Sequence, residues 1–291
     1  MSAQRPGRRG IILCVVGVVL VILGVLWSTV IFPSLNKVPT DLDTTLYFDG
    51  NFTVPNPATG SLVTFPIEEI LQINGNGTQD GALFVHEKYT VKNAATGVDL
   101  PNFSIEQTLA VDRKTLEIVT NIDEQHRSGY WGPPRGLGEG DSFDLWNPGA
   151  HKALKATYVK DDTFRGLKVV IFQIDEQNIP LGTEPQSQLP LLMDTTINLT
   201  IEPKTGAVVD EDALTATSLS MGGQKVPVLI SNVRYAERTI VDMVDTAKDA
   251  RRKLFLFETV IPWVLIGVGA ILVIIGVMLM SRKRGAAATA L

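Results

Sequence analysis

Two long apolar runs, one near each end of the chain, constrain the fold more than any other feature. The first covers residues 11–32 and the second covers residues 259–280, and neither contains a charged residue. At the rise of an α-helix, each run reaches roughly 30 Å, which is the thickness of the hydrocarbon layer of a bilayer. The sequence therefore predicts two transmembrane helices with one large region between them.

The first run is long for a cleavable signal peptide. The apolar region of such a peptide covers about 7 to 15 residues and ends at small residues, whereas this run ends with the bulky Ile31 and Phe32. Cys14 lies at the start of the run and follows Leu13, which is a poor context for lipoprotein processing. Retention as a membrane anchor is the preferred interpretation, and cleavage after export is the alternative.

Basic residues flank each run on the side of the chain end: Arg5, Arg8, Arg9, Arg282, Lys283 and Arg284. Because basic flanks stay inside the cell, both termini are predicted to be cytoplasmic, the middle region extracytoplasmic and the location the plasma membrane. The predicted parts are a basic tail (1–10), a transmembrane helix (11–32), a β-rich domain (33–235), a juxtamembrane amphipathic helix (236–258), a second transmembrane helix (259–280) and a basic tail (281–291).

The middle region is acidic and contains no cysteine. All 31 acidic residues lie between Asp41 and Glu258, whereas six of the 26 basic residues lie in the tails, which leaves a net charge of −11 between them. Such a charge disfavours nucleic acid, so nucleic acid is excluded as a partner. Since the one cysteine, Cys14, lies in the first span, burial and hydrogen bonds must stabilise the domain without disulfides.

Strand patterns and turn patterns alternate through the middle region. The strand segments are rich in β-branched and aromatic residues, and the turns at Asp112–Thr115 and Pro203–Gly206 predict two hairpins. No helix long enough for a parallel crossover occurs there, so the fold class is mainly β (α+β), with an antiparallel sheet or barrel-like domain. The predicted strands are residues 82–91, 104–111, 115–122, 166–174, 195–202 and 225–233.

An amphipathic helix is predicted at residues 236–258, between the β-rich domain and the second span. Ile240, Val244 and Ala247 recur there at helical spacing. Basic residues near its end are predicted to lie at the membrane interface, where long side chains reach lipid phosphates. These interface residues are Arg251, Arg252 and Lys253.

The residue combinations that support catalysis or metal binding are missing from the sequence. The three histidines, His86, His126 and His151, are too far apart to form a helical pair, and the middle region has no cysteine to complete a zinc site. No phosphate-binding glycine loop, dinucleotide fingerprint or nucleophile elbow occurs. The sequence therefore predicts a protein that is not an enzyme and that uses no metal and no cofactor.

Residues 126–149 have the most unusual composition of the middle region. They place Tyr130, Trp131, Phe143 and Trp146 among glycines and prolines, which predicts a long loop. In one interpretation the loop is packed on its own aromatic side chains. In the other, the four aromatic residues form the entrance to an apolar cavity and bind an apolar ligand, because such side chains provide large contact area at small entropic cost.

The order of these parts resembles the PorA family of actinobacterial cell-envelope proteins. The resemblance rests on the terminal spans and on the segments VDRKTLEIV, DSFDLWNPGAHKALKATYVKDDTFRGLKVVIFQ and LTIEPKTGAVVDED. Phe143, Tyr158, Asp161 and Gly166-Leu167 occupy the family positions of the middle segment, although the proline that usually follows the aromatic residue is missing. The resemblance implies a porin of the mycolic-acid outer membrane and specifies no catalytic residue.

The layout of two terminal spans around a β-rich domain is also similar to that of class B scavenger receptors, whose ectodomains enclose a lipid-conducting tunnel. That likeness is architectural, since those receptors carry ectodomain disulfides that this chain lacks. Two apolar helices and an acidic domain suit an inner membrane better than a spanning barrel, whose strands need an apolar outward face.

Three functions are open on this basis. The first is a two-span cell-envelope protein whose β domain binds or conducts an apolar ligand, such as an envelope lipid. The second is a channel-forming, porin-like oligomer, and the third is a structural or scaffold module. Membrane lipid is a partner in each of them. Glycines in the spans, among them Gly17, Gly24 and Gly269, would allow close helix packing and a homo-oligomer.

Overall fold

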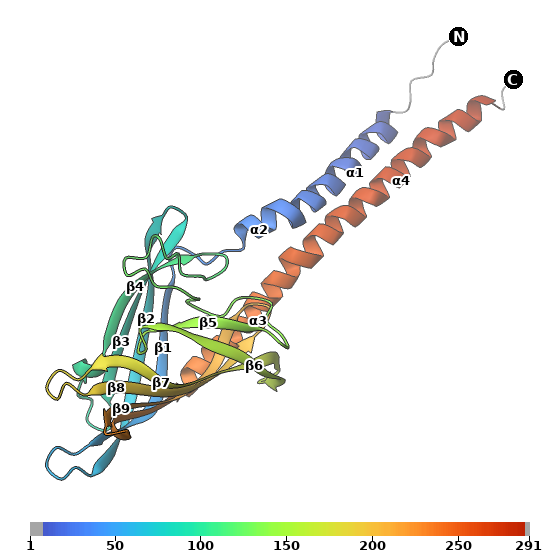
Figure 1. Cartoon of the computed structure of the whole chain (residues 1–291). Coiled ribbons are helices and arrows are strands. Elements are labelled where there is room, and N and C mark those ends of the chain that lie inside the picture. Colours follow the sequence, from blue (N-terminus) through green and yellow to red (C-terminus); the bar gives the residue numbers. More distant parts are fainter. Residues whose placement is uncertain (1–7, 289–291) are drawn as a thin grey trace. The chain divides into compact units, whose positions relative to one another are not determined.

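The computed structural model of the chain describes the backbone of residues 8–288 and the side chains of residues 8–281 (Figure 1). The chain forms two compact units. Residues 38–249 make up one unit, the β domain, and the segments before and after it make up the other, the helical unit.

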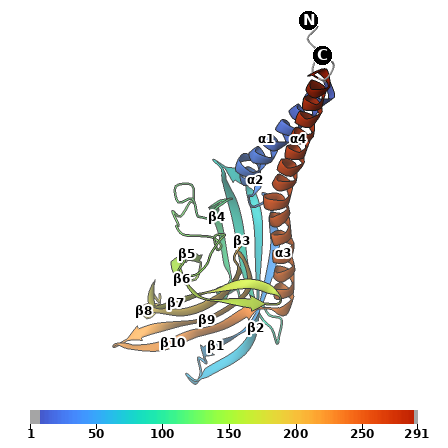
Figure 2. The same ribbon diagram turned by 90° about the vertical axis from the view of Figure 1, so that its right-hand side faces the viewer.

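The β domain is built on one ten-stranded antiparallel sheet that curls along its length (Figures 1 and 2). The strand order is β4-β3-β2-β1-β10-β9-β8-β7-β6-β5, so β4 and β5 are the two edges. This architecture confirms the predicted mainly β, antiparallel fold. The strands are β1 (Asp43–Pro55), β2 (Leu62–Gln79), β3 (Ala82–Asn93), β4 (Ile105–Asp112), β5 (Ser142–Asn147), β6 (Lys152–Phe164), β7 (Leu167–Thr183), β8 (Pro190–Glu202), β9 (Ala207–Met221) and β10 (Gln224–Tyr235).

The predicted strands are confirmed in β3, β4, β7, β8 and β10, and the turn at Pro203–Gly206 does connect β8 to β9. The strand predicted at residues 115–122 is wrong. Leu116 has a φ of +66°, which no extended strand allows, so the chain leaves β4 through the Asp112 turn and makes only isolated bridges afterwards. The loop predicted at residues 126–149 contains strand β5, and the strands β1, β2 and β6 lay outside the prediction.

One face of the sheet carries most of the core and is called here the inner face. It is defined by Phe48 on β1, Leu71 on β2 and Val85 on β3, which are all buried. Strands alternate their side chains between two faces, so the pairing register assigns every other residue to this face. Ile240, Val244 and Ala247 of helix α3 (Glu237–Phe255) join the same apolar cluster, which confirms the predicted apolar face of that helix.

The helical unit contains two helices that are long and apolar enough to cross a membrane. The first runs through α1 (Arg8–Leu26), a π-helical turn (Trp27–Ile31) and α2 (Phe32–Leu35), and the second runs from the end of α3 through a π-helical turn (Leu256–Val260) into α4 (Ile261–Ala288). Helices α1 and α4 pack side by side in antiparallel orientation (Figures 1 and 2). Of the predicted basic flanks, Arg5 and the side chains of residues 282–284 lie outside the described part of the chain.

Each π-helical turn is followed within two residues by a proline, Pro33 or Pro262. Next to Pro262, the N–H of Ile261 bonds to the carbonyl of Leu256, so the following carbonyl, that of Phe257, would need the N–H that proline lacks. The indole N–H of Trp27 donates to this carbonyl at 2.8 Å. A side chain of one helix thus satisfies a backbone group that proline leaves unpaired in the other, as a low-dielectric membrane requires.

Glycines with a seven-residue spacing form the contact between α1 and α4. Gly10, Gly17 and Gly24 are the buried residues of α1. A Cβ atom on Gly17 would lie 2.5 Å from the carbonyl oxygen of Gly269, and one on Gly269 would lie 2.6 Å from that of Gly17. These glycines are therefore used for packing within the chain. A Cβ atom on Gly267 would meet no other atom within 4 Å, so this glycine takes no part in the contact.

Gly17→Leu is expected to push α1 and α4 apart, because the new side chain meets backbone that cannot move without separating the helices. The cost should be about 1–3 kcal/mol. The native Cys14 donates to the carbonyl of Val273 at 3.6 Å, so Val273→Cys supplies a partner for an oxidation assay. Gly17→Leu should slow this disulfide formation, whereas Gly267→Leu should leave it unchanged; equal rates would contradict the glycine contact.

Candidate functional site

The connection between β4 and β5 joins the two edges of the sheet. Its residues 116–131, called here the closing segment, form bridges between Val111 of β4 and Ile118, between Glu117 and Tyr130, and between Tyr130 and Leu145 of β5. Backbone hydrogen bonds of 2.7–2.8 Å, from Val119 to Ala110 and from Tyr130 to Asp144, reinforce both junctions. The closing segment therefore pairs the exposed edge of each terminal strand, which an open sheet would leave free.

Two tryptophans anchor this region to the inner face. The indole N–H of Trp131 donates to Glu87 of β3 at 2.7 Å, and that of Trp146 donates to Gln107 of β4 at 3.2 Å. Gln107 in turn donates to the second carboxylate oxygen of Glu87 at 2.7 Å. Burial raises the pKa of Glu87 and outweighs the opposite effect of these hydrogen bonds and of Arg127. The carboxyl group is thus fully engaged and acts as a structural acceptor.

A buried ion pair holds the closing segment itself. Asp123 and Arg127 are almost completely buried, and their side chains are joined by hydrogen bonds of 2.6 and 2.9 Å. Arg127 also donates to the carbonyl of Thr108 and to the side chain of Gln107. Burial alone would raise the pKa of Asp123, but hydrogen bonds from Arg127 hold it below its usual value. The pair is therefore charged and paired in the folded domain.

The four aromatic residues proposed from the sequence as ligand contacts lie in two different clusters. Phe143 is buried and packs near Phe172, with ring centroids 5.4 Å apart, and Tyr130 packs edge-on against Phe143. Trp131 and Trp146 pack against the other cluster and carry the hydrogen bonds described above. The structure thus engages all four in packing, and it does not bring them together around one space.

A second polar group lies on the inner face, and one of its members, Tyr89, is two residues from Glu87 on β3. Phe48 of β1 pairs with both Glu69 of β2 and Tyr235 of β10, so the three side chains point the same way. Tyr89 is two residues from Val91, the partner of Glu69, and shares its face. Glu211 shares the face of Tyr235, because Val233 pairs with Ala213 and each lies two residues away. Glu69, Tyr89, Glu211 and Tyr235 are called here the inner cluster.

The members of the inner cluster affect one another electrostatically. Burial raises the pKa of Glu69 to about 7. Burial also raises the pKa of Glu211 to about 7, with the negative charge of Glu69 as the next cause. The pKa values of Tyr89 and Tyr235 are raised by burial and then by neighbouring carboxylates, Glu211 among them. The four groups therefore share a region of negative potential on this face of the sheet.

The polar ends of this cluster have no protein partner. Within the described part of the chain, neither carboxyl group and neither phenol hydroxyl of the four makes a side-chain hydrogen bond, although Tyr235 is only 5% exposed. Glu69, Tyr89 and Glu211 are half-buried, so their polar ends are open to a small molecule or to water. Among the described residues, the side-chain atom that is fully buried without a hydrogen-bond partner is Oδ1 of Asp210, next to Glu211 on β9.

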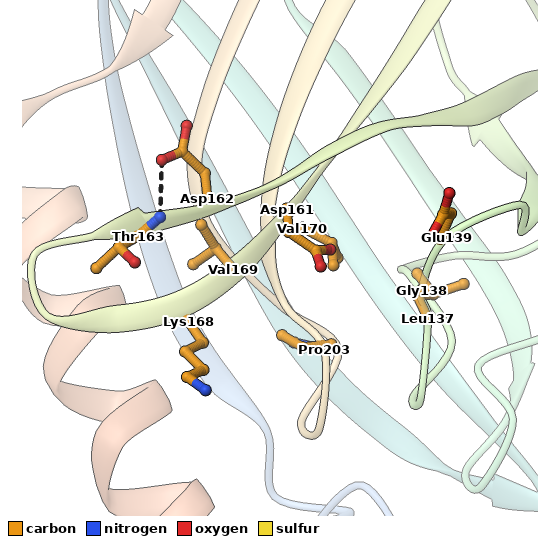
Figure 3. Close-up of a pocket in the computed structure, with 10 residues that line it drawn as sticks. All are labelled: Leu137, Gly138, Glu139, Asp161, Asp162, Thr163, Lys168, Val169, Val170 and Pro203. Atoms are coloured by element: carbon orange, nitrogen blue, oxygen red, sulfur yellow. Dashed lines mark hydrogen bonds between the residues drawn. The ribbon is translucent and has the colours of Figure 1, made fainter.

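A separate open groove of about 590 Å³ lies on the β6–β7 hairpin (Figure 3). Two of its three acidic residues have partners: Asp161 accepts from Tyr158 at 3.0 Å, and Asp162 accepts from Lys160 at 2.6 Å and from the backbone of Thr163. Leu137–Glu139 and Pro203 complete its wall. No group of three or more metal-ligating side chains occurs among the residues described.

Of the remaining predicted site residues, Arg252 and Lys253 lie in the last turn of α3 and are exposed, and Arg251 immediately precedes them. The inner cluster was missed from the sequence. Its signal is the alternation Ile67, Glu69, Leu71, Ile73 in β2, where one carboxylate shares a face with three large apolar residues. That alternation becomes meaningful only once β2 is known to be a strand.

Comparison with known proteins gives one strong match. The family model described as Porin PorA matches residues 9–278. No curated protein matches the sequence. Two solved structures show low similarity. Rv2717c from M. tuberculosis has 10% identity and a TM-score of 0.28, and the match covers 66% of this chain and 91% of Rv2717c. DynF from the dynemicin biosynthesis pathway of Micromonospora chersina has 9% identity and a TM-score of 0.25, and the match covers 69% of this chain and 81% of DynF. Since the family model covers nearly the whole chain and two helices are apolar enough to span a bilayer, the protein is a membrane protein that belongs to the Porin PorA family.

Proposed function

We propose that this protein is a two-span cell-envelope protein whose β domain binds an apolar or amphipathic ligand, such as an envelope lipid, on the inner face of its sheet. The observation that carries the proposal is the inner cluster, whose polar ends have no partner among the described residues and lie amid apolar side chains such as Phe48 and Leu71. Ligand sites combine mostly apolar walls with a few convergent polar groups in this way. Catalysis is not part of the proposal.

The proposed location is the plasma membrane, with the β domain outside and both termini in the cytoplasm. Helices α1 and α4 are antiparallel, so the ends that lead to the two termini are at the same side. Arg8 and Arg9 begin α1 at that side, and the sequence places further basic residues after α4. Basic flanks favour the cytoplasm, and this supports the proposed orientation.

The test is native mass spectrometry of the full-length protein extracted from its own membrane, with analysis of the lipid that co-purifies. Val233→Trp places a large side chain on the inner face beside Ala213, whereas Leu214→Trp places the same side chain on the opposite, exposed face. We expect one tightly held lipid per chain in the wild type and in Leu214→Trp, and its loss in folded Val233→Trp. A lipid-free wild type, or equal lipid in both variants, would contradict the proposal.

The alternative is a channel-forming oligomer, which the family description favours. A channel needs a polar lumen, and the outward side chains of α1 and α4 that the structure describes are mainly valine, isoleucine and leucine. Any lumen would therefore have to form between β domains. Planar-bilayer recording of the purified protein tests this alternative. Stepwise conductance, together with a wild type that carries no lipid, would support the channel and contradict the ligand-binding proposal.

A further inference from the structure

One edge of strand β6 is free where β6 runs past the end of its neighbour β5. Strand β5 pairs with β6 only as far as Thr157, whereas β7 pairs with β6 as far as Phe164. The N–H of Tyr158 still donates to the loop before β5 at 3.2 Å, but within the described part of the chain nothing pairs with this side of β6 beyond it. Residues 159–164, called here the β6 edge, therefore pair on one side only.

The turn between β6 and β7 determines which backbone groups of the β6 edge point outward. Arg165 and Gly166 have φ values of +46° and +80°, as in a two-residue hairpin turn whose flanking residues form a hydrogen-bonded pair. Hydrogen-bonded and non-hydrogen-bonded pairs alternate in an antiparallel ladder, so the N–H and C=O groups of Asp161 and Thr163 point away from β7. In agreement with this direction, the N–H of Thr163 donates to the carboxylate of Asp162 at 2.8 Å (Figure 3).

The open groove of about 590 Å³ lies along this edge (Figure 3). Residues 161–163 line it from β6, residues 137–139 line it from the loop before β5, and Val170, which is only 4% exposed, adds apolar surface. The N–H of Gly136 donates to the carbonyl of Pro203 at 2.6 Å and so holds the loop in place. The structure therefore contains a preformed slot beside unpaired backbone.

The charges of the groove are mainly negative. Glu139, Asp161 and Asp162 line it, against one basic residue, Lys168. Asp162 is bonded to Lys160, whereas the exposed side chain of Glu139 has neither a hydrogen bond nor an ion pair with any described residue. Symmetric pairing of two copies of the β6 edge, centred on Asp161 or Asp162, would place a carboxylate opposite itself, which is destabilising. The charges therefore favour a basic partner over a second copy of this chain.

We propose that the β6 edge binds an extended, basic segment of another protein as an additional strand. The backbone of the segment pairs with the outward groups of Asp161 and Thr163, and its basic side chains complement the carboxylates of Glu139 and Asp161. In strand addition of this kind, main-chain hydrogen bonds provide affinity and alternate side chains provide specificity. The β6 edge is separate from the inner cluster, so this inference is independent of the proposed function.

The experiment measures binding of fluorescent peptides of about eight residues, long enough for one strand, to the full-length protein in nanodiscs of zwitterionic lipid. Binding to empty nanodiscs is subtracted. One peptide alternates arginine with valine, a second alternates glutamate with valine, and a third is the arginine peptide with N-methyl groups along its backbone, which cannot donate. We expect the arginine peptide to bind roughly tenfold more tightly than either of the others, because each of them lacks the positive charge or the backbone donors.

Two variants test whether the peptide binds at the β6 edge. Thr163→Pro removes an outward N–H without changing the charge, and proline is tolerated on a free strand edge. Glu139→Gln/Asp161→Asn removes two carboxylates; both side chains are exposed, so this variant keeps the test valid if the proline variant fails to fold. Each variant should weaken binding of the arginine peptide roughly tenfold. The matched control is Glu106→Gln/Glu124→Gln, which removes two exposed carboxylates outside the groove and should bind as the wild type does.

The outcomes decide whether the β6 edge is a binding site. If no peptide binds above the empty-nanodisc level, or if the arginine and glutamate peptides bind equally, the inference is overturned. Equal binding of the N-methylated peptide would show attraction between charges without strand pairing, and unchanged binding to both variants would place the site elsewhere; either result also overturns it. A wild-type dimer in native mass spectrometry that Thr163→Pro dissociates would assign the edge to a second copy and contradict the proposal. None of these results affects the test of lipid binding on the inner face.

Discussion

Asp123→Ala is expected to destabilise the β domain by about 3–5 kcal/mol, because it leaves the guanidinium group of Arg127 buried without its counter-charge. The side chains of Arg127 and Asp123 are 4% and 0% exposed, so water cannot replace the lost partner. Arg127 also bonds to the backbone of β4, so the change should loosen the junction between β4 and the closing segment. Chemical denaturation of the full-length protein measures the first effect, and amide hydrogen exchange of residues 116–131 measures the second.

The matched control is Glu106→Ala on β4. This change removes an exposed carboxylate that lies 3.8 Å from Lys88 on the neighbouring strand β3. Exposed ion pairs contribute only about 0–1 kcal/mol, so this variant should unfold almost as the wild type does. A loss of stability in Asp123→Ala no larger than in Glu106→Ala would show that the ion pair does not hold the closing segment.

The second large effect concerns pH. The pKa values of Glu69 and Glu211 rise from 4.5 to about 7 on folding, so between these values the folded domain binds more protons than the unfolded chain. Their contribution to stability is therefore fully present below about pH 4.5 and is lost as the pH rises from there through about 7. Glu69→Gln/Glu211→Gln removes this loss. The variant should match the wild type at low pH and exceed it at about pH 8 by about 3 kcal/mol for each of the two carboxyl groups.

Comparing the variant with the wild type at each pH is essential, because other carboxyl groups act in the opposite direction. The pKa values of Asp123, Asp194 and Glu237 are lowered in the folded domain, so their stabilisation is lost as the pH falls. Those contributions cancel in the difference between the two proteins. A difference that does not change with pH would show that Glu69 and Glu211 titrate normally and that the inner face is open to bulk water.

In the closing segment, local sequence patterns predict the turn at its start but not the pairing of the chain that follows. The turn at Asp112 was predictable, because an aspartate side chain that accepts from the backbone of Lys114 and Thr115 forms such a turn by itself. The chain after the turn was predicted as a strand from its composition, yet Ile118 pairs with Gly129 and Leu116 with Trp131. These partners are determined by the approach of β4 and β5, which no short stretch of sequence specifies.

The inner cluster likewise could not be predicted from short stretches of sequence. Glu69, Tyr89, Glu211 and Tyr235 lie on β2, β3, β9 and β10, and each alone is an ordinary strand residue. The strand register places them on one face of the sheet. Burial at that face raises the pKa values of Glu69 and Glu211 to about 7. The aromatic residues at 130–146, which stand out in composition, serve to fasten the edges of the sheet.

Two apolar helices, the lack of a disulfide within the chain, the antiparallel β class and the family could all be predicted from the sequence, because each follows from composition or from spacing along the chain. Tertiary structure alone decided that the glycines of α1 and α4 pack against each other, that the closing segment joins β4 to β5, and that four polar side chains meet on the inner face. The physical reason is that register and curvature of a ten-stranded sheet depend on contacts between residues far apart in the chain.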